Sequence, residues 1–369
     1  MSRSIDHKWL LHRFAAMTAF ATLLLICVGG VVTSKEVGMS VPDWPTTYGY
    51  NMFLFPVSKW VGGILYEHSH RLVASVVGFL TVILAVWLWC KEARRWMRWL
   101  GVAAVLAVVL QGVLGGLRVT QVKDELGIFH AALAQLFFVL VSAIALFSSR
   151  WWLNAGKLPN STDGRGLASL YWMGTGLIFF QLVLGATMRH LHAGLAISDF
   201  PLAHHQIWPA VDAASITRYN QERIETIAIN PITAFQVVLQ MAHRITALLI
   251  LTVVLWTTGR TARRLGWKTP LTKLSMAWCG LILGQVALGA ATIWTNKSAD
   301  IATAHVAVGA LSLMTGAMMI LVAYRCIPVG DEVTSLNCCG ADQRLVTSSP
   351  TGVDQRLVTS SPTAVRVRA

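Results

Sequence analysis

The stretch EHSHRLVASVVGFLTVILAVWLW, residues 67–89, places ionisable side chains directly before a long apolar run. The run is long enough to cross a bilayer, which takes about 20 residues as a helix. Glu67, His70 and Arg71 therefore stand at the mouth of a predicted membrane span. Ionisable groups are costly to bury there, so by default they form a candidate functional site.

The composition of the whole chain is that of a membrane protein. Of its 369 residues, 55% are hydrophobic and 13% are charged, and the mean hydropathy is +0.58, far from the profile of a soluble globular protein. Eight apolar segments are long enough to span a lipid bilayer as helices. They cover residues 14–33, 70–90, 97–117, 127–148, 167–187, 236–258, 273–294 and 303–325. We therefore predict an all-α integral membrane protein with eight transmembrane helices.

The lysines and arginines predict the orientation of the chain. They are concentrated in the N-terminal arm, in the segments that follow the second, fourth and sixth spans, and in the C-terminal segment. Because such side chains are enriched in cytoplasmic loops, both termini are predicted to be cytoplasmic. The two long loops, 34–66 and 188–235, are then extracytoplasmic, in a protein of the cell (inner) membrane. The same distribution accounts for the net charge of +13 without a nucleic-acid partner, which we exclude.

The first four spans and the last four carry the same pattern of residues. The matching positions are Gly29, Gly38, Asp43, Trp44 and Pro45 with Gly185, Gly194, Asp199, Phe200 and Pro201; His70-Arg71 with His243-Arg244; Gln111, Leu114 and Gly115 with Gln285, Leu288 and Gly289; and His130 with His305. Four spans is an even number, so both copies have the same orientation. We predict two four-helix bundles related by a pseudo-twofold axis along the membrane normal.

These two copies predict how the chain is divided. The N-terminal half covers residues 1–150 and the C-terminal half covers 151–327. A tail over 328–369 contains DQRLVTSSPT twice. Because this tail is polar and contains proline, we expect it to be disordered and dispensable for the chemistry.

Four histidines occupy corresponding places in the two halves. His70, His130, His243 and His305 lie in the outer parts of the even-numbered spans. Two facing imidazoles inside a four-helix bundle form a bis-histidine site for haem iron, whereas two per half fall short of a tetrahedral zinc site. A single intramembrane histidine is more often a packing residue or a proton relay. The paired and duplicated set favours one haem site in each half.

Glycines and arginines accompany these histidines, and each has two interpretations. The glycines near the outer ends of the odd-numbered spans permit close helix packing and equally leave room for a flat ligand. Arg71 and Arg244 directly follow His70 and His243. They are suited to pairing with haem propionates, and equally to anchoring the chain at the membrane interface.

The two halves differ one helical turn before the first histidine. Glu67 precedes His70 by three residues, whereas Gln240 precedes His243. A carboxylate near iron can accept a proton or stabilise a cationic intermediate, and an amide cannot take up a proton at neutral pH. We therefore assign the chemistry to the N-terminal half, with Glu67 as the catalytic residue, and a resident electron-transfer haem to the C-terminal half. The alternative is that Glu67 is only an interfacial charge.

Other histidines lie outside this pattern. His190, His192, His204 and His205 are close in sequence within the second long loop. Their spacing permits a metal site, but exposed loop histidines are common and usually bind nothing. His68 has no histidine counterpart in the second half, so we interpret it as a supporting or incidental residue.

Taken together, these residues resemble the haem A synthase family, over nearly all of residues 10–326. The resemblance rests on GMSVPDWPTTYG at 38–49, Glu67-x-x-His70-Arg71, His130 followed by AALAQ, Gln240-x-x-His243-Arg244, and His305 followed by VAVGAL. It implies oxidation of the C8 methyl group of haem O to a formyl group, which gives haem A for terminal cytochrome oxidase. In the family this proceeds by successive hydroxylations and a dehydration, with electrons from an external donor.

The resemblance also implies roles for individual residues and partners. His70 and His130 would be the ligands of the substrate haem O, and His243 and His305 the ligands of haem b. Glu67 matches the family's important glutamate. The implied partners, besides haem O and the lipid bilayer, are haem O synthase and cytochrome oxidase subunits.

One feature departs from the family pattern, and two other functions remain open. Some bacterial members carry a cysteine pair in the first outer loop, but residues 34–66 contain no cysteine, so a thiol role there is excluded. The first alternative is a dihaem b-type membrane cytochrome that transfers electrons, for example from a quinol. The second is a transporter or structural membrane protein whose histidines relay protons.

Overall fold

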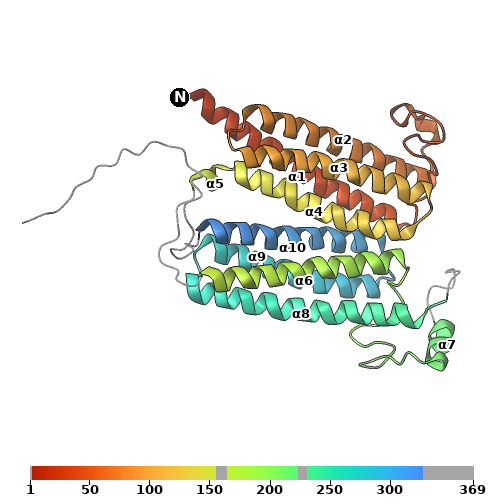
Figure 1. Ribbon diagram of the computed structural model, residues 1–369. Helices are drawn as coiled ribbons and strands as arrows, with labels where there is room; N and C mark the ends of the chain where they lie inside the picture. The colour runs from red at the N-terminus through yellow and green to blue at the C-terminus, as the bar shows by residue number, and fades with distance from the viewer. Residues whose placement is uncertain (1, 155–163, 223–230, 327–369) are drawn as a thin grey trace, which may run out of the picture. The chain divides into compact units, whose positions relative to one another are not determined.

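The computed structural model describes residues 2–154, 164–222 and 231–326, and over these residues it contains helices and loops but no strand (Figure 1). The long helices are α1 (Ser2–Ser34), α2 (Gly62–Lys91), α3 (Arg95–Thr120), α4 (Asp124–Ser148), α6 (Gly164–His190), α8 (Ala234–Leu265), α9 (Pro270–Trp294) and α10 (Ala299–Cys326). The tail predicted over 328–369 lies outside the described residues.

Each of the eight long helices is apolar enough to cross a membrane. They coincide with the eight predicted segments, so the prediction of an all-helical protein with eight spans is confirmed. The helices are longer than the apolar runs, however. α2 begins at Gly62 rather than near residue 70, and its polar side chains Glu67, His68 and Arg71 find partners in the loop before it. Helical hydrogen bonding then continues where the sequence is no longer apolar.

Four shorter elements were not predicted, and most of them lie in the two long loops. The first loop contains the 3₁₀ turns η1 (Met52–Leu54) and η2 (Val57–Lys59). The second contains α7 (Ala213–Glu222), and α5 (Arg150–Asn154) follows α4. These elements are too short to show a helical period against a polar, proline-containing background.

The long helices form two groups of four (Figure 1). In the first group, α2 and α4 each pack against both α1 and α3; in the second, α8 and α10 each pack against both α6 and α9. The histidine-bearing helices therefore lie diagonally across each group. Between the groups, α1 packs against α10, and α4 packs against α6 and α10.

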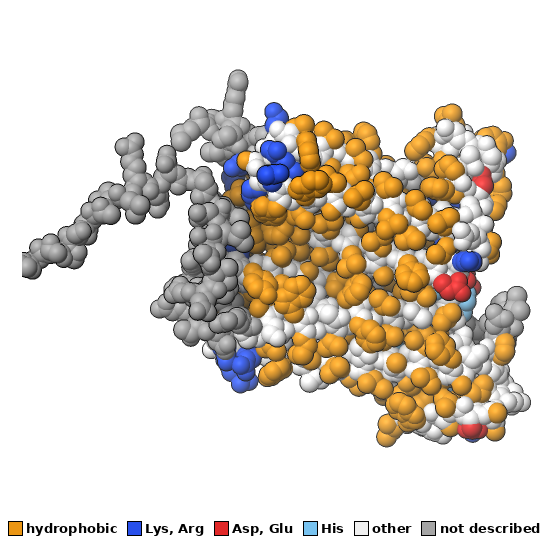
Figure 2. Space-filling model, in the orientation of Figure 1, with side chains coloured by type: hydrophobic (Ala, Val, Ile, Leu, Met, Phe, Trp, Pro, Cys, Tyr) orange, Lys and Arg blue, Asp and Glu red, His pale blue; other side chains and the backbone are white. Residues whose placement is uncertain are grey.

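Large apolar side chains cover both the inside and the lipid-facing outside of the helices. Buried clusters fill the interior of each group, and the indole of Trp278 donates a hydrogen bond of 2.8 Å to the carbonyl of Ser312. Figure 2 shows apolar side chains along the helices and a concentration of lysine and arginine at the end where α1 begins. A lipid-facing apolar surface bounded by charge is expected of a protein that spans a bilayer.

Candidate functional site

Each of the four predicted iron-binding histidines lies against a glycine of a neighbouring helix. A Cβ atom added to that glycine would lie between 3.1 and 3.5 Å from the imidazole Cε1. The pairs are Gly29 with His70, Gly115 with His130, Gly185 with His243, and Gly289 with His305. These glycines therefore make room for the imidazole rings of the neighbouring helices.

The imidazoles are half-buried, and none of their Nδ1 atoms has a hydrogen-bond partner. The Nδ1 atoms of His70, His130, His243 and His305 are all buried without one. A buried polar atom without a partner calls for an explanation in a native structure. Imidazoles that the protein leaves unbonded, on diagonally opposed helices of a bundle, fit a haem iron site.

Glutamine amides fix the backbone of three of these histidines. Gln111 Nε2 donates to the carbonyl of His130 (3.0 Å) and Gln285 Nε2 to that of His305 (2.7 Å). Gln181 Nε2 donates in the same way to the carbonyl of His243 (2.9 Å). The sequence analysis missed this function, although each glutamine precedes a histidine-facing glycine by four residues and so lies on the same helix face.

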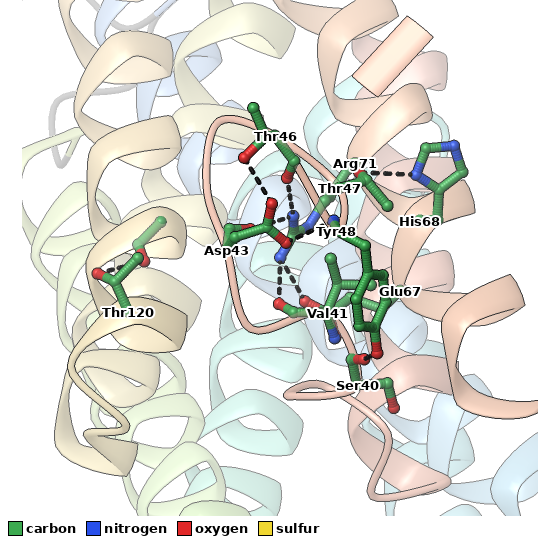
Figure 3. A network of polar contacts seen from close by, with 11 residues as sticks. Ser40, Val41, Asp43, Thr46, Thr47, Tyr48, Glu67, His68, Arg71 and Thr120 are labelled. Carbon is green, nitrogen blue, oxygen red and sulfur yellow. Dashed lines mark hydrogen bonds and ion pairs between the residues drawn. The ribbon is translucent and has the colours of Figure 1, made fainter. Parts of the chain in front are cut away.

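Glu67 and Arg71 tie the first outer loop to α2. Glu67 is 3% exposed, and its Oε2 accepts the N–H of Val41 at 2.8 Å. Its Oε1 accepts from Arg71 Nη2 at 2.8 Å. Arg71 also donates to the carbonyls of Val41 (2.8 Å), Asp43 (2.7 Å) and Thr46 (3.1 Å). Figure 3 shows its guanidinium inside the curve of the loop.

Asp43 organises the loop around this clamp. Its carboxylate accepts the backbone N–H groups of Tyr48 (2.7 Å) and Gly49 (2.9 Å) and the hydroxyl of Thr46 (2.5 Å). Partial burial would raise the pKa of Asp43, but these hydrogen bonds outweigh it and lower the pKa below its usual value. The loop is closed by the Tyr48 hydroxyl, which donates to the carbonyl of Ser40 at 2.6 Å.

The second outer loop repeats this arrangement with different side chains. The carboxylate of Asp199 accepts the backbone N–H groups of His204 (2.7 Å) and His205 (2.8 Å). The His204 ring takes the place of the Tyr48 hydroxyl, because its Nε2 donates to the carbonyl of Ala196 at 2.9 Å. His204 also stacks on Tyr219, with ring centroids 3.5 Å apart. His204 therefore has a structural function in this loop.

Gln240 and Arg244 hold the second loop as Glu67 and Arg71 hold the first. Gln240 Oε1 accepts the N–H of Ile197 at 2.7 Å, and its Nε2 donates to the Ile197 carbonyl at 3.1 Å. Arg244 donates to the carbonyls of Asp199 (2.7 Å) and Leu202 (2.8 Å). Both loops are thus fixed to a helix by the same pair of positions, and the distinguishing feature of the first half is a carboxylate paired with its arginine.

The four histidines of the second loop do not come together. His190 ends α6, and its ring packs on Gly127 with Nδ1 3.9 Å from Asp124 Oδ1. His192 lies 3.7 Å from the carboxylate of Glu36. In the parts of the chain that the structure describes, no group of three or more histidine, cysteine, aspartate or glutamate side chains is arranged to hold a metal ion. The structure therefore gives no support to a metal site in this loop.

His68 is a supporting residue of the first loop. It is fully buried, and its Nδ1 lies 3.2 Å from the hydroxyl of Thr47. Its ring packs against Phe55 and Trp60, with centroid distances of 5.0 and 4.7 Å. The side chain thus points into the loop.

Comparisons with known proteins agree with this geometry. The family model for cytochrome oxidase assembly protein matches residues 12–317. The haem A synthase of Alkalihalophilus pseudofirmus is 26% identical over 315 residues, which cover 82% of this chain and 95% of that protein. The haem A synthase of Shouchella clausii is 28% identical over 300 residues, covering 79% of this chain and 89% of that protein.

A third haem A synthase aligns over a similar length. That of Shewanella oneidensis is 25% identical over 326 residues, covering 83% of this chain and 93% of that protein. The residues that the family model matches, 12–317, include all four of the histidines described above. The chain therefore belongs to the cytochrome oxidase assembly protein family, the family of the haem A synthases.

Proposed function

We propose that this protein is a haem A synthase, which oxidises the C8 methyl group of haem O to a formyl group. The observation that carries this proposal is the set of four half-buried imidazoles, each seated against a glycine and unbonded at Nδ1. Membership of the family supplies the reaction. The bound haems supply the iron redox chemistry, and the chain positions them.

Within this function, the two halves have different tasks. His70 and His130 are the proposed ligands of the substrate haem O, and His243 and His305 are the proposed ligands of a resident haem b. The assignment rests on a carboxylate three residues before the first histidine, which is Glu67 in the first half and is replaced by Gln240 in the second. Haem b is thus the proposed electron-transfer group, and it receives its electrons from a donor outside the enzyme.

Glu67 is the proposed catalytic residue. Its two oxygens are bonded to Val41 and Arg71, but a carboxylate oxygen has two lone pairs and can accept a further proton donor. Gln240 cannot act as a base, since an amide does not take up a proton at neutral pH, and its amide hydrogens are directed at the carbonyls of Gly194 (3.4 Å) and Ile197 (3.1 Å). The difference in charge therefore gives only the first half a base next to its histidine.

We also propose the predicted symmetry, with a pseudo-twofold axis that relates an N-terminal half (1–150) to a C-terminal half (151–327). The contacts between the helix groups support it. An axis that exchanges the halves pairs the α1–α10 contact with the α6–α4 contact and places the α4–α10 contact on the axis. Both termini are then cytoplasmic, and both long loops lie on the extracytoplasmic side of the cell membrane.

The proposed partners follow from the reaction. Haem O synthase would supply the substrate, and cytochrome oxidase subunits would receive haem A. Both exchanges involve an apolar molecule, so they are expected to take place within or at the bilayer.

Haem extraction tests the function. The full chain is expressed together with a haem O synthase in a host that makes no haem A, and the extracted haems are separated by chromatography. Haem A is the expected product. Retention of haem b alone would indicate a dihaem cytochrome, and a protein without a Soret band would reject both haem-based functions.

A further inference from the structure

The arginines first considered as propionate partners are largely occupied by the outer loops. Both terminal nitrogens of Arg71 are used, for three loop carbonyls and Glu67. Arg244 donates to two carbonyls of the second loop. A haem carries two propionates, whose carboxylates need cationic or hydrogen-bonding partners when they leave water. We therefore expect another residue of the substrate site to donate hydrogen bonds to the propionates.

Arg118 has the required position. It lies on α3, three residues after Gly115, the glycine against which His130 packs. Its guanidinium lies against the first outer loop, where a Cβ atom added to Gly38 would be 3.0 Å from Nη1 and 3.5 Å from Nη2. It is thus a second positive charge, besides Arg71, at the outer end of the first histidine pair.

Arg118 also has unused bonding capacity. Within the described residues, it is the only arginine with a buried side-chain nitrogen that lacks a partner, and this nitrogen is Nε. Its Nη2 contact with Asp124 Oδ1 is long, at 3.4 Å, and the Asp124 carboxylate is 45% exposed. A buried N–H without an acceptor destabilises the folded protein, so an acceptor for Nε is expected in the functional complex.

The second half has no equivalent of this side chain. The position that corresponds to Arg118 on α9 is Thr292, whose hydroxyl donates to a carbonyl of its own helix at 2.8 Å. Arg189 on α6 is a cation of the second half, but it donates to the Gly30 carbonyl and the Ser34 hydroxyl of α1, both at 2.8 Å. Arg118 therefore distinguishes the first site from the second.

We propose that Arg118 binds a propionate of haem O, through its Nε and a terminal nitrogen, and so fixes the propionate edge of the substrate on the α3 side of the first helix group. The inference rests on the proposed assignment of haem O to this half. A guanidinium presents two parallel N–H groups to a carboxylate, and such charge-assisted pairs are short and strong. Arg118 is thus a substrate-binding residue that orients haem O.

The test compares haem O with its propionate dimethyl ester. Both are titrated into the purified full-length protein carrying haem b, and binding is followed by the change in the Soret band. Replacing Arg118 by Gln is expected to weaken haem O binding at least about tenfold, the effect of losing one hydrogen bond between charged groups. The ester, which has no carboxylate, is expected to bind equally to wild type and R118Q.

Two further variants complete the test. Lys123→Gln removes an exposed positive charge from the same turn and is expected to leave haem O binding unchanged. Arg118→Lys keeps the positive charge but lacks the two parallel N–H groups of the guanidinium. Its affinity for haem O is expected to lie between those of wild type and R118Q. An unchanged haem b spectrum in R118Q shows that the variant is folded.

The outcomes separate this inference from the proposed function. Equal weakening of haem O and ester by R118Q would show that Arg118 is only structural, and no weakening of either would show that it does not contact the substrate. Both results would overturn the inference while leaving haem A synthesis intact. A wild-type protein that binds no haem O and makes no haem A would instead reject the function.

Discussion

Glu67 and Gln240 occupy matching positions and hold matching loops, so the comparison between them isolates the effect of charge. Each accepts a backbone N–H, from Val41 and Ile197 respectively, at 2.8 and 2.7 Å. A glutamine at position 67 can keep that bond through its amide oxygen. Loss of function in such a variant would therefore reflect the loss of the carboxylate and its pair with Arg71.

Replacing Glu67 by Gln is expected to lower haem A yield by about a hundredfold or more, because proton transfer by a positioned side chain contributes that much. Both haems should remain bound, which the absorption spectrum checks. In the other half, Gln240→Glu would set a carboxylate against the carbonyls of Gly194 and Ile197, so it is expected to loosen the second loop without supplying a base to the first half. A normal yield from E67Q would refute the catalytic role.

The glycines against the imidazoles give a test of the assignment of the halves. Gly185→Leu would force the side chain into the ring of His243, whose Cε1 lies 3.4 Å from an added Cβ. Overpacking of this kind costs about 1–3 kcal/mol, so haem b retention is expected to fall roughly tenfold. Haem content by pyridine haemochrome measures it.

The control is Gly280→Leu, on α9, where an added Cβ meets nothing within 4 Å. This variant should keep its haem b. Full haem b retention by G185L, together with loss of haem O binding, would show that the two sites are assigned the wrong way round.

The sequence reveals a functional position most readily when both halves can be aligned on the same residue type. It does not reveal that different side chains at corresponding positions do the same task. His70, His130 and Glu67 stood out because a second copy invited comparison. His204 was considered as a metal ligand, although it performs the task of Tyr48 through the Ala196 carbonyl. Every residue carries a backbone carbonyl, so the sequence does not show which carbonyl a side chain such as His204 will bond.

At the scale of elements, the two outer loops are each fixed to the start of an even-numbered span by one arginine. Arg71 and Arg244 donate to carbonyls at corresponding loop positions. The sequence identified the arginines, but it offered propionate pairing or interfacial anchoring as their function. The loop clamp was missed because it depends on the folded path of residues 38–49, which no helical or strand period describes.

Replacing Arg71 by Gln should release the first loop selectively. Four hydrogen bonds to loop atoms and Glu67 are lost, so amide exchange in residues 38–49 is expected to rise at least about tenfold. Arg244→Gln is the matched variant and should do the same for residues 194–206 only. Hydrogen–deuterium exchange with mass spectrometry resolves both segments. Equal exchange in wild type and R71Q would contradict the clamp.

At the scale of the whole molecule, charge and an even number of spans together predict which side each loop faces. Outside the helices, the two groups are also joined by Glu36, whose carboxylate lies 3.0 Å from Lys297 and 3.7 Å from His192. Burial opposes ionisation of Glu36, but the hydrogen bond and charge of Lys297, together with the contact to His192, outweigh it and lower its pKa. The long loops of the two groups thus meet at one end, which must face one side of the membrane.

Cysteine labelling tests this sidedness. In a cysteine-free background, Ser58→Cys lies in the first long loop and Lys268→Cys in the turn between α8 and α9, and both positions are exposed. Because arginines at the end of α8 predict that this turn is cytoplasmic, an impermeant maleimide added to intact cells should label S58C and spare K268C. Permeabilised cells should show labelling of both, which controls for reactivity. Labelling of K268C alone in intact cells would invert the topology and place both haem sites near the cytoplasmic face.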